Sequence, residues 1–363
     1  MHCVLQGGRR SLILSGLPNA VVLVVPFAQR RIVILSRPEP APSSTTRNMS
    51  SQPEATAAMP PMMYGTAWKK ERTADLVFEA IKAGFRGIDT AAMKKHYDEA
   101  GTGEGIRRAI REGIVSRKDL FIQTKFTPED PSSPYSLNDP IPAQIHASIT
   151  SSLANLSTPD RSPPYLDALV MHSPFTTIAD TLEAWTALEC YLPTSLDSSR
   201  RGKILRLGIS NVTLPVLLAL SDSTTRQPMI VQNRFRAAER SWDRDIRTWC
   251  ASTTQPLCSG SGSQEQEKVN YYQGFWTLTG NPGTWQLAGF VRELAEAAGI
   301  SPAAAWYVLL MEADVVVLNG TSDAAHMRED LDARRKVEAF RRTDAGEEVW
   351  RRCWVEFKRL IGG

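Results

Sequence analysis

The sequence predicts an α/β fold in the form of an (α/β)8 TIM barrel, and three observations predict it. From Met62 onward, short apolar runs typical of strands alternate with amphipathic helical patterns. Polar or ionisable residues end several of these runs, which is typical of a barrel whose active site draws on many strands. No G-x-G-x-x-G signature of a doubly wound dinucleotide-binding sheet follows the first run.

Each expected strand is a short apolar run bounded by turn residues or helical patterns. These runs cover residues 62–66, 86–89, 120–125, 166–172, 204–209, 229–233, 271–276 and 315–318. Helices are expected at about 71–83, 104–112, 142–156 and 178–190, then around 287–294, from Pro302 onward and at 346–361. In the first helix, Leu76, Val77, Ala80 and Ile81 share one face, and Gly84 suits the position just past its end.

The chain is expected to divide into three parts. Residues 1–61 form an N-terminal extension that is disordered or acts in targeting, residues 62–340 form the barrel, and residues 341–363 form a C-terminal helix that packs on it. The opening of the extension fits a mitochondrial transit peptide, and the alternatives are a weak membrane anchor over 11–28 or a true start at Met49. Residues 251–270 form an atypical polar insertion, either a surface loop or an unspliced stretch of the gene.

Composition excludes some partners. Residues 1–38 hold five arginines and no acidic residue. The positive charge of these arginines exceeds the net charge of +3 of the whole chain, so the barrel itself is close to neutral. A nucleic-acid binder would instead show a basic footprint, and none is expected here. The five cysteines contain no C-x-x-C pair, which favours a reducing compartment, and a cytoplasmic location is expected unless the transit peptide is real. No membrane association is expected, and the oligomeric state is predicted as monomer or weak oligomer.

Three consecutive strands close on ionisable residues, Asp89, Lys125 and His172, and Tyr97 follows Asp89 in a loop. Barrel strands present their C-terminal ends at one mouth, so these side chains are expected to meet there. A tyrosine can donate a proton to a carbonyl oxygen, and a lysine ammonium held by a carboxylate is expected to lower the tyrosine's ordinary pKa of about 10. A neutral histidine can hydrogen-bond the same oxygen. The four residue types therefore predict reduction of a carbonyl by a hydride donor without a metal.

Five motifs carry a resemblance to a known family. They are GIDTA at 87–91, QTK at 123–125, MHSP at 171–174, GISN at 208–211 and VQNRF at 231–235. The motifs resemble those of the aldo-keto reductase superfamily over nearly the whole barrel. The resemblance implies that Tyr97 donates the proton, Lys125 is its electrostatic partner, Asp89 supports Lys125, and His172 orients the carbonyl. Tyr97 follows Asp89 by eight positions, more than is usual in the family but similar to a fungal subgroup, and Tyr64 is the nearby competitor.

The resemblance also implies a dinucleotide extended across the mouth. Ser210, Asn211 and Gln232 would contact the nicotinamide carboxamide, and an aromatic ring, Phe275 or alternatively Tyr272, would stack on the nicotinamide. The loop after the eighth strand, with Gly320, Thr321 and Ser322, resembles the family's phosphate-binding loop. The family's basic residues are missing at Thr321 and His326, so Arg328 is expected to substitute, with Glu329 and Asp330 near the adenine. NADPH is the expected cofactor, and NADH stays open.

The predicted function is NADPH-dependent reduction of an aldehyde or ketone, a small-molecule carbonyl substrate that the sequence does not name. One alternative is a non-catalytic dinucleotide-binding barrel that acts as a redox-sensing or regulatory subunit. A second is a chain in which residues 251–270 keep the seventh strand from closing the barrel.

Overall fold

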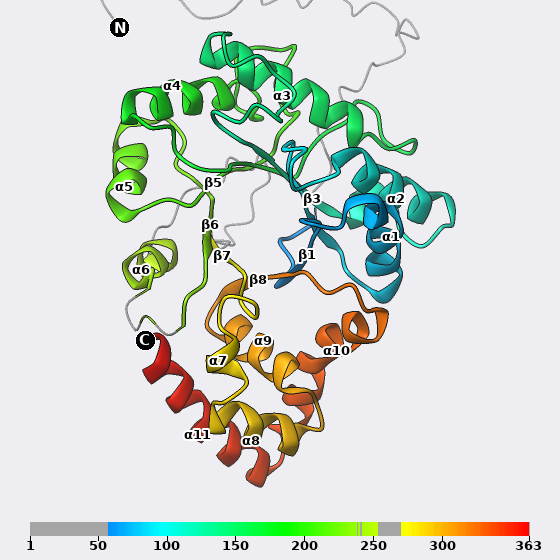
Figure 1. The fold of residues 1–363 in the computed structure, drawn as a ribbon, viewed down its shortest axis with the longest axis vertical. Coiled ribbons are helices and arrows are strands. Elements are labelled where there is room, and N and C mark those ends of the chain that lie inside the picture. Colours follow the sequence, from blue (N-terminus) through cyan, green and yellow to red (C-terminus); the bar gives the residue numbers. More distant parts are fainter. Residues whose placement is uncertain (1–56, 238, 240–241, 253–269, 363) are drawn as a thin grey trace, which may run out of the picture. The chain divides into compact units, whose positions relative to one another are not determined.

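A computed structural model describes residues 57–362 except 238, 240–241 and 253–269. The strands are all parallel and close into a barrel in chain order, with helices outside it (Figure 1). They are β1 Met62–Gly65, β2 Gly87–Asp89, β3 Phe121–Phe126, β4 Ala168–Met171, β5 Leu207–Ser210, β6 Ile230–Arg234, β7 Tyr271–Phe275 and β8 Val315–Asn319. The (α/β)8 barrel predicted from the sequence is confirmed.

The helices follow the expected alternation, with further helices that were not expected from the sequence and one that begins earlier than expected. They are α1 Thr73–Ala83, α2 Glu99–Arg111, α3 Ile141–Asn155, α4 Ile178–Glu189, α5 Leu214–Ser223, α6 Arg244–Ser252, α7 Pro282–Trp285, α8 Gly289–Ala298, α9 Pro302–Glu312, α10 Ala324–Phe340 and α11 Asp344–Ile361. Helix α5 was not predicted, because its run of apolar residues lacks a clear amphipathic period. Helix α2 begins before residue 104 because the Asp98 carboxylate caps it, accepting from Gly101 N at 2.8 Å.

Residues 57–61 belong to the fold rather than to the extension. Inward-facing apolar side chains fill the lower half of the barrel, and Ala57 and Met59 pack against this layer. The layer consists of Met63, Phe121, Ala168, Val170, Ile230 and Val316. Ala57 and Met59 thus contact the barrel core although they lie on the N-terminal side of the predicted boundary at residue 61. Residues 1–56, on which the disorder and targeting predictions fall, lie outside the described residues.

A second apolar core lies between the strands and the helices. Helix α11 joins it through Phe357, whose ring centroid is 5.4 Å from that of Trp306 on α9 and 6.4 Å from that of Phe290 on α8. Trp306 and Phe357 are fully buried. The C-terminal helix thus packs on α8 and α9, which form part of the helical layer at the same end of Figure 1.

The seventh strand takes its place in the barrel. β7 pairs with β6 over residues from Tyr271 to Phe275 and with β8 on its other side. The alternative in which 251–270 prevents closure is therefore wrong for the chain that the structure describes. Residues 253–269 of that insertion lie outside the described residues, and helix α6 is present before them.

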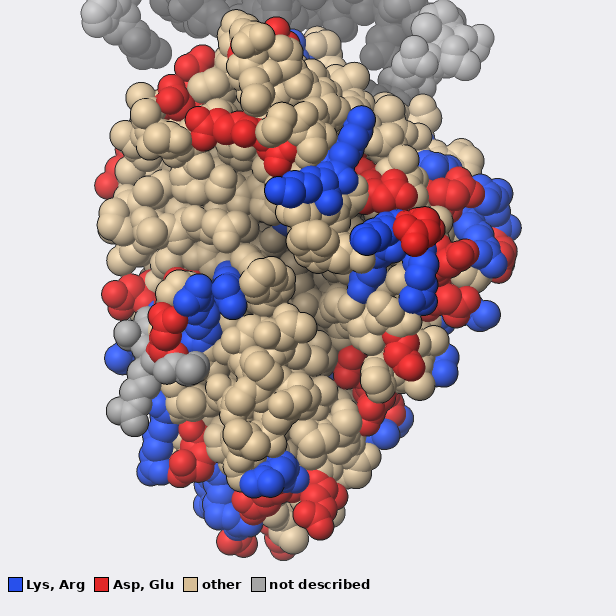
Figure 2. Space-filling model, viewed as in Figure 1, with Lys and Arg blue, Asp and Glu red and all other residues tan. Residues whose placement is uncertain are grey.

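The described surface carries both signs of charge. On the face drawn in Figure 2, Lys and Arg are interspersed with Asp and Glu around uncharged areas. Among the described helices, none alone combines the length and apolar composition of a membrane span, and α8 with α9 passes only as a pair bent by 102°. Cys190, Cys250 and Cys353 are not part of a disulfide in the described chain.

Candidate active site

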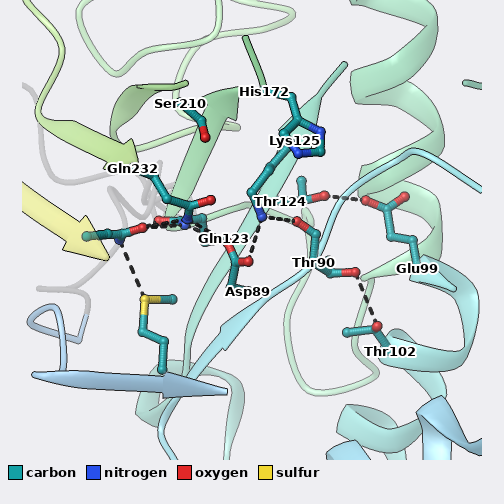
Figure 3. A network of polar contacts seen from close by, with 12 residues as sticks. Asp89, Thr90, Glu99, Thr102, Gln123, Thr124, Lys125, His172, Ser210 and Gln232 are labelled. Carbon is teal, nitrogen blue, oxygen red and sulfur yellow. Dashed lines mark hydrogen bonds and ion pairs between the residues drawn. The ribbon is translucent and has the colours of Figure 1, made fainter. Parts of the chain in front are cut away.

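A buried ion pair occupies the mouth of the barrel. Asp89 is the last residue of β2 and Lys125 faces inward from β3, so both side chains point to the C-terminal ends of the strands (Figure 3). Lys125 Nζ donates to Asp89 Oδ2 at 2.6 Å and to the Thr90 carbonyl at 2.9 Å. Both side chains are at most 3% exposed. The pairing predicted from two strand ends is present.

A layer of glutamine side chains lies directly below Asp89. Gln123 Nε2 donates to Asp89 Oδ1 at 2.7 Å, and Gln232 Nε2 approaches the same oxygen at 3.2 Å. Gln273 and Gln123 pair through their amide groups at 2.9 Å in both directions. Ammonium and amide donors thus hold the carboxylate from two sides, which makes the orientation of the Asp89–Lys125 pair rigid. Sequence reasoning missed Gln123 and Gln273, although polar residues inside apolar strands were a signal.

His172 follows β4 and is neutral. Its Nδ1 lies 2.8 Å from Thr127 Oγ1, and this hydrogen bond fixes the ring orientation. Burial and the nearby Lys125 charge lower the pKa of His172 to about 3. The imidazole is therefore uncharged at neutral pH, as its predicted role requires. Thr127, two residues after Lys125, is a further contact that the sequence did not reveal.

The loop after β2 doubles back and brings Tyr97 to the mouth. The Tyr97 ring centroid is 5.3 Å from Lys125 Nζ and 6.0 Å from the His172 ring. The loop is also held by Trp68, whose backbone N donates to the His96 carbonyl at 2.8 Å and whose ring contacts the His96 ring in a tilted arrangement with centroids 3.8 Å apart. The eight-residue spacing is therefore compatible with a four-residue cluster.

The competing tyrosine lies elsewhere. Tyr64 is fully buried, packs edge-on against Phe85 at 5.5 Å, and donates its hydroxyl to the Thr321 carbonyl at 3.0 Å. Its neighbour Met63 faces the barrel interior, so Tyr64 points to the opposite side of β1. The structure brings Tyr97, and not Tyr64, to Lys125.

The expected lowering of the Tyr97 pKa is wrong for this structure. Burial raises the pKa of Tyr97, and the Asp89 carboxylate raises it further. The physical reason is that Asp89 neutralises the Lys125 ammonium, while burial disfavours a phenolate. The phenol therefore stays protonated through the neutral range, which is the state that a proton donor needs. An alkoxide is a much stronger base than a phenolate and can take this proton.

Ser210 ends β5 and Asn211 follows it, while Gln232 lies beside Ser210 in the middle of β6. Asn211 Nδ2 donates to the His172 carbonyl at 2.9 Å and lies 3.2 Å from Ser210 Oγ. Gln232 Nε2 already has an acceptor as well, since it donates to Gln273 Oε1 at 2.7 Å. In this arrangement the side-chain oxygens of Asn211 and Gln232 could accept from a carboxamide, and the Ser210 hydroxyl could donate to one.

Strand alternation separates the two aromatic candidates. Tyr271 and Gln273 face the barrel interior, so Phe275 is next on that face and stands at the mouth. Tyr272 faces outward, is 3% exposed, and donates its hydroxyl to Asp243 at 2.8 Å. Of the two rings, Phe275 is therefore the one placed to stack on a nicotinamide.

A hollow of about 450 Å³ lies beside the loop after β8 and is lined in part by Gly320, Thr321 and His326. Lys69, from the loop after β1, donates to the Gly320 carbonyl and lies 3.4 Å from Ser322 Oγ. Burial lowers the pKa of this ammonium, and the Arg72 charge adds to the effect. Sequence reasoning missed Lys69, which brings a cation to a loop whose own basic residues are absent.

Arg328 and Glu329 lie differently with respect to this hollow. Arg328 is exposed and is not among the residues that line the hollow, because the helical spacing of α10 turns His326, Glu329 and Asp330 toward it instead. Glu329 accepts from Ser301 N at 2.8 Å and so caps α9. Asp330 accepts from Asn319 at 2.7 Å, and burial raises its pKa to about 6.

Fold and site together define a class of protein, a parallel barrel that brings a Tyr, a Lys, an Asp and a His together at its mouth and has a hollow beside the loop after its last strand. The family model described as "Aldo/keto reductase family" matches residues 61–342. The chain belongs to the aldo/keto reductase family, as the motifs predicted.

Individual relatives agree with this assignment. "Uncharacterized oxidoreductase YtbE" of Bacillus subtilis is 35% identical over 171 residues, which is 47% of this chain and 51% of that protein. "Methylglyoxal reductase DkgA" of Escherichia coli is 26% identical over 219 residues, covering 58% and 68%. The chain thus aligns with about half of the first of these proteins and two thirds of the second. An aldo-keto reductase of Bombyx mori solved in complex with NADP has the same fold, with a TM-score of 0.57, 20% identity and coverage of 76% and 84%.

Proposed function

We propose that the protein reduces an aldehyde or ketone to an alcohol with NADPH, and that Tyr97 donates the proton. The observation that carries the proposal is the convergence of Tyr97 and His172 on the buried Lys125–Asp89 pair at one barrel mouth. Membership of the family supports the reaction class. The names of relatives such as DkgA, a methylglyoxal reductase, support a small carbonyl substrate.

Each residue has a separate task. NADPH, when bound, supplies a hydride to the carbonyl carbon. The neutral His172 hydrogen-bonds the carbonyl oxygen and sets its position, since its other ring nitrogen is held by Thr127. Tyr97 gives its hydroxyl proton to that oxygen as negative charge develops there. Lys125 then stabilises the phenolate, and Asp89 keeps the ammonium in place.

The described residues fit the cofactor. Phe275 offers a ring at the mouth, and the hollow near Gly320 is open, since a Cβ placed on Gly320 would meet no atom within 4 Å. Lys69 would hold a phosphate group of the dinucleotide, because its ammonium lies at the edge of this loop. A phosphate contact there favours NADPH over NADH if it is made with the 2′-phosphate.

Tyr97→Phe tests the proton donor. We expect turnover with a panel of aldehydes to fall by about 10²- to 10⁴-fold, because the hydride can still be offered but the alkoxide has no acid beside it. The NADPH dissociation constant should stay within about twofold, since the ring is retained. Absorbance of the reduced nicotinamide measures the first quantity, and quenching of protein fluorescence measures the second.

Tyr165→Phe is the matched control. Tyr165 is buried before β4, at the opposite end of the barrel, and its variant should keep wild-type turnover. Retained turnover in Tyr97→Phe would show that another group donates the proton. Binding of NADPH by the wild-type protein without turnover of any aldehyde or ketone would favour the alternative, a non-catalytic dinucleotide-binding barrel.

A further inference from the structure

A second hollow, of about 600 Å³, lies on the β5, β6 and β7 side of the mouth, and its lining residue Asn211 donates to the His172 carbonyl. Asn211 and Phe275 line both this hollow and the place proposed for the nicotinamide. Arg234, the last residue of β6, also lines it. Because Ile230 and Gln232 face inward on the same strand, Arg234 faces inward too, one step above Gln232. An arginine therefore stands at the rim of the reaction site.

Arg234 has no anionic partner among the described residues. Its guanidinium stacks on the Trp276 ring at 4.6 Å, and its Nε is buried without a hydrogen-bond partner. A half-buried guanidinium in this state carries unused donors, which is costly unless an acceptor completes them. Stacking leaves the edge of the guanidinium free, and that edge matches a carboxylate or phosphate in a bidentate contact.

Trp276 is held in an unusual conformation. Its φ of 55° is rare for a bulky residue, and its side chain is 48% exposed next to Phe275, with ring centroids 6.0 Å apart. Backbone contacts fix it, since Gly280 N donates to the Trp276 carbonyl at 2.8 Å. Strain of this kind is concentrated at functional sites. Here it keeps a flat ring under the Arg234 guanidinium and beside the hollow.

Among the described residues, the acidic side chains near Arg234 form no ion pair with it. Asp243 lines the hollow, but its Oδ2 accepts from Asn233 Nδ2 at 2.8 Å and from the Tyr272 hydroxyl at 2.8 Å. Asp245 is exposed at the start of α6, beside the exposed Arg244. On the face in Figure 2, basic side chains gather between α6 and the centre of the molecule.

A second arginine in the hollow is already paired. Arg236 forms an ion pair with Glu239 at 3.0 Å, and its guanidinium lies 4.8 Å from the Trp242 ring. Arg236 therefore already has an anionic partner, whereas Arg234 has none among the described residues. A bound anion would complete this site.

We propose that Arg234, supported by Trp276, recognises an anionic group on the substrate, so that the enzyme prefers carbonyl compounds that carry a carboxylate or phosphate. This inference rests on the proposed reductase function and adds the substrate class. The hollow adjoins the proposed nicotinamide position, which allows one small molecule to place its carbonyl near Tyr97 and its anionic end near Arg234. Recognition is by charge-assisted hydrogen bonds, and no covalent step is involved.

The test compares 4-carboxybenzaldehyde with benzaldehyde, two rigid aldehydes that differ by one carboxylate. The wild-type enzyme should have the higher kcat/KM for the anion, and Arg234→Gln should reduce the ratio of the two values by about 10- to 100-fold. Arg234→Lys should restore part of the ratio, since it keeps the charge but not the planar fork. Arg359→Gln, on the exposed part of α11, should leave the ratio unchanged.

Cofactor phosphate is the competing anion, and NADPH titration distinguishes it. If Arg234→Gln leaves the ratio of the two kcat/KM values unchanged, the proposal is overturned. It is also overturned if kcat/KM falls equally for both aldehydes while NADPH binds more weakly, because that result would assign Arg234 to the pyrophosphate of the cofactor. Calorimetric titration of both aldehydes into the NADP⁺-loaded protein needs no turnover. If the wild-type protein reduces neither aldehyde, the proposed function fails, whereas selective calorimetric binding of the carboxylated one through Arg234 would still support the anion site.

Discussion

The buried Lys125–Asp89 pair allows stability and catalysis to be separated by substitution. At 2.6 Å, Coulomb's law with an effective dielectric constant of about 20 gives a gross attraction of about 6 kcal/mol, most of which offsets the cost of burial. Lys125→Met leaves a carboxylate that is 2% exposed with only the amides of Gln123 and Gln232 as side-chain donors. We expect this variant to lose about 3–5 kcal/mol of unfolding free energy.

Adding Asp89→Asn to Lys125→Met should recover most of that stability, because a neutral amide replaces the unpaired charge. Turnover should not recover. Both variants lack the ammonium that lies 5.3 Å from the Tyr97 ring, so both should be slower than wild type by about 10²- to 10⁴-fold. Urea unfolding followed by circular dichroism gives the stabilities, and nicotinamide absorbance gives the rates.

A second buried ion pair provides the control. Arg117 Nη2 lies 2.8 Å from Asp167 Oδ2 at the other end of the barrel, with side-chain exposures of 3% and 0%. Arg117→Met should lose stability, and the double variant with Asp167→Asn should regain part of it, with the turnover of folded protein unaffected throughout. Wild-type rates in the Lys125→Met, Asp89→Asn double variant would refute the electrostatic role of Lys125. Unchanged stability in Lys125→Met would refute the estimate of the pair's contribution.

Three further predictions concern the layers around this pair. Gln123→Leu removes a hydrogen-bond donor to Asp89 and the amide partner of Gln273. It should lower kcat more than NADPH affinity and reduce the free energy of unfolding by about 1–3 kcal/mol. The control variant Gln144→Leu, on α3, should leave kcat unchanged. Gly208→Ala should destabilise the protein by about 1–3 kcal/mol in thermal or urea unfolding, because the new Cβ would lie 2.7 Å from the Ile230 Cβ. In the control variant Gly289→Ala, on α8, the new Cβ meets no atom within 4 Å, so this variant should be slightly more stable than wild type. The lowered pKa of His172 means that only the unfolded chain takes up this proton between its ordinary value of 6.5 and about 3. The free energy of unfolding should therefore decrease as the pH is lowered from 6.5 to about 3, by up to about 1.4 kcal/mol per pH unit. His172→Asn should remove that component of the pH dependence.

The sequence by itself determined the barrel and the position of its reactive ends. Parallel strands all present their C-terminal ends at one mouth, so Asp89, Lys125 and His172 could be grouped from strand order alone. The alternation of side chains between the two faces of a strand likewise depends only on neighbouring residues in the chain. It also separates Phe275 from Tyr272 once the inward face of β7 is known.

Only the tertiary structure decided which distant residues complete the site. Gln123 and Gln273 are 150 positions apart, and Lys69 and Gly320 are 251 apart, so their contacts depend on barrel closure and loop paths rather than on local pattern. The same closure decides that Asp89 neutralises Lys125 and that burial raises the pKa of Tyr97. Hydrophobic periodicity is a property of neighbouring residues in the chain, whereas the desolvation and pairing of buried charges are properties of the assembled core. The sequence therefore grouped Asp89, Tyr97, Lys125 and His172 at the mouth, and the folded barrel set their partners and the direction in which their environment shifts the pKa values of Tyr97 and His172.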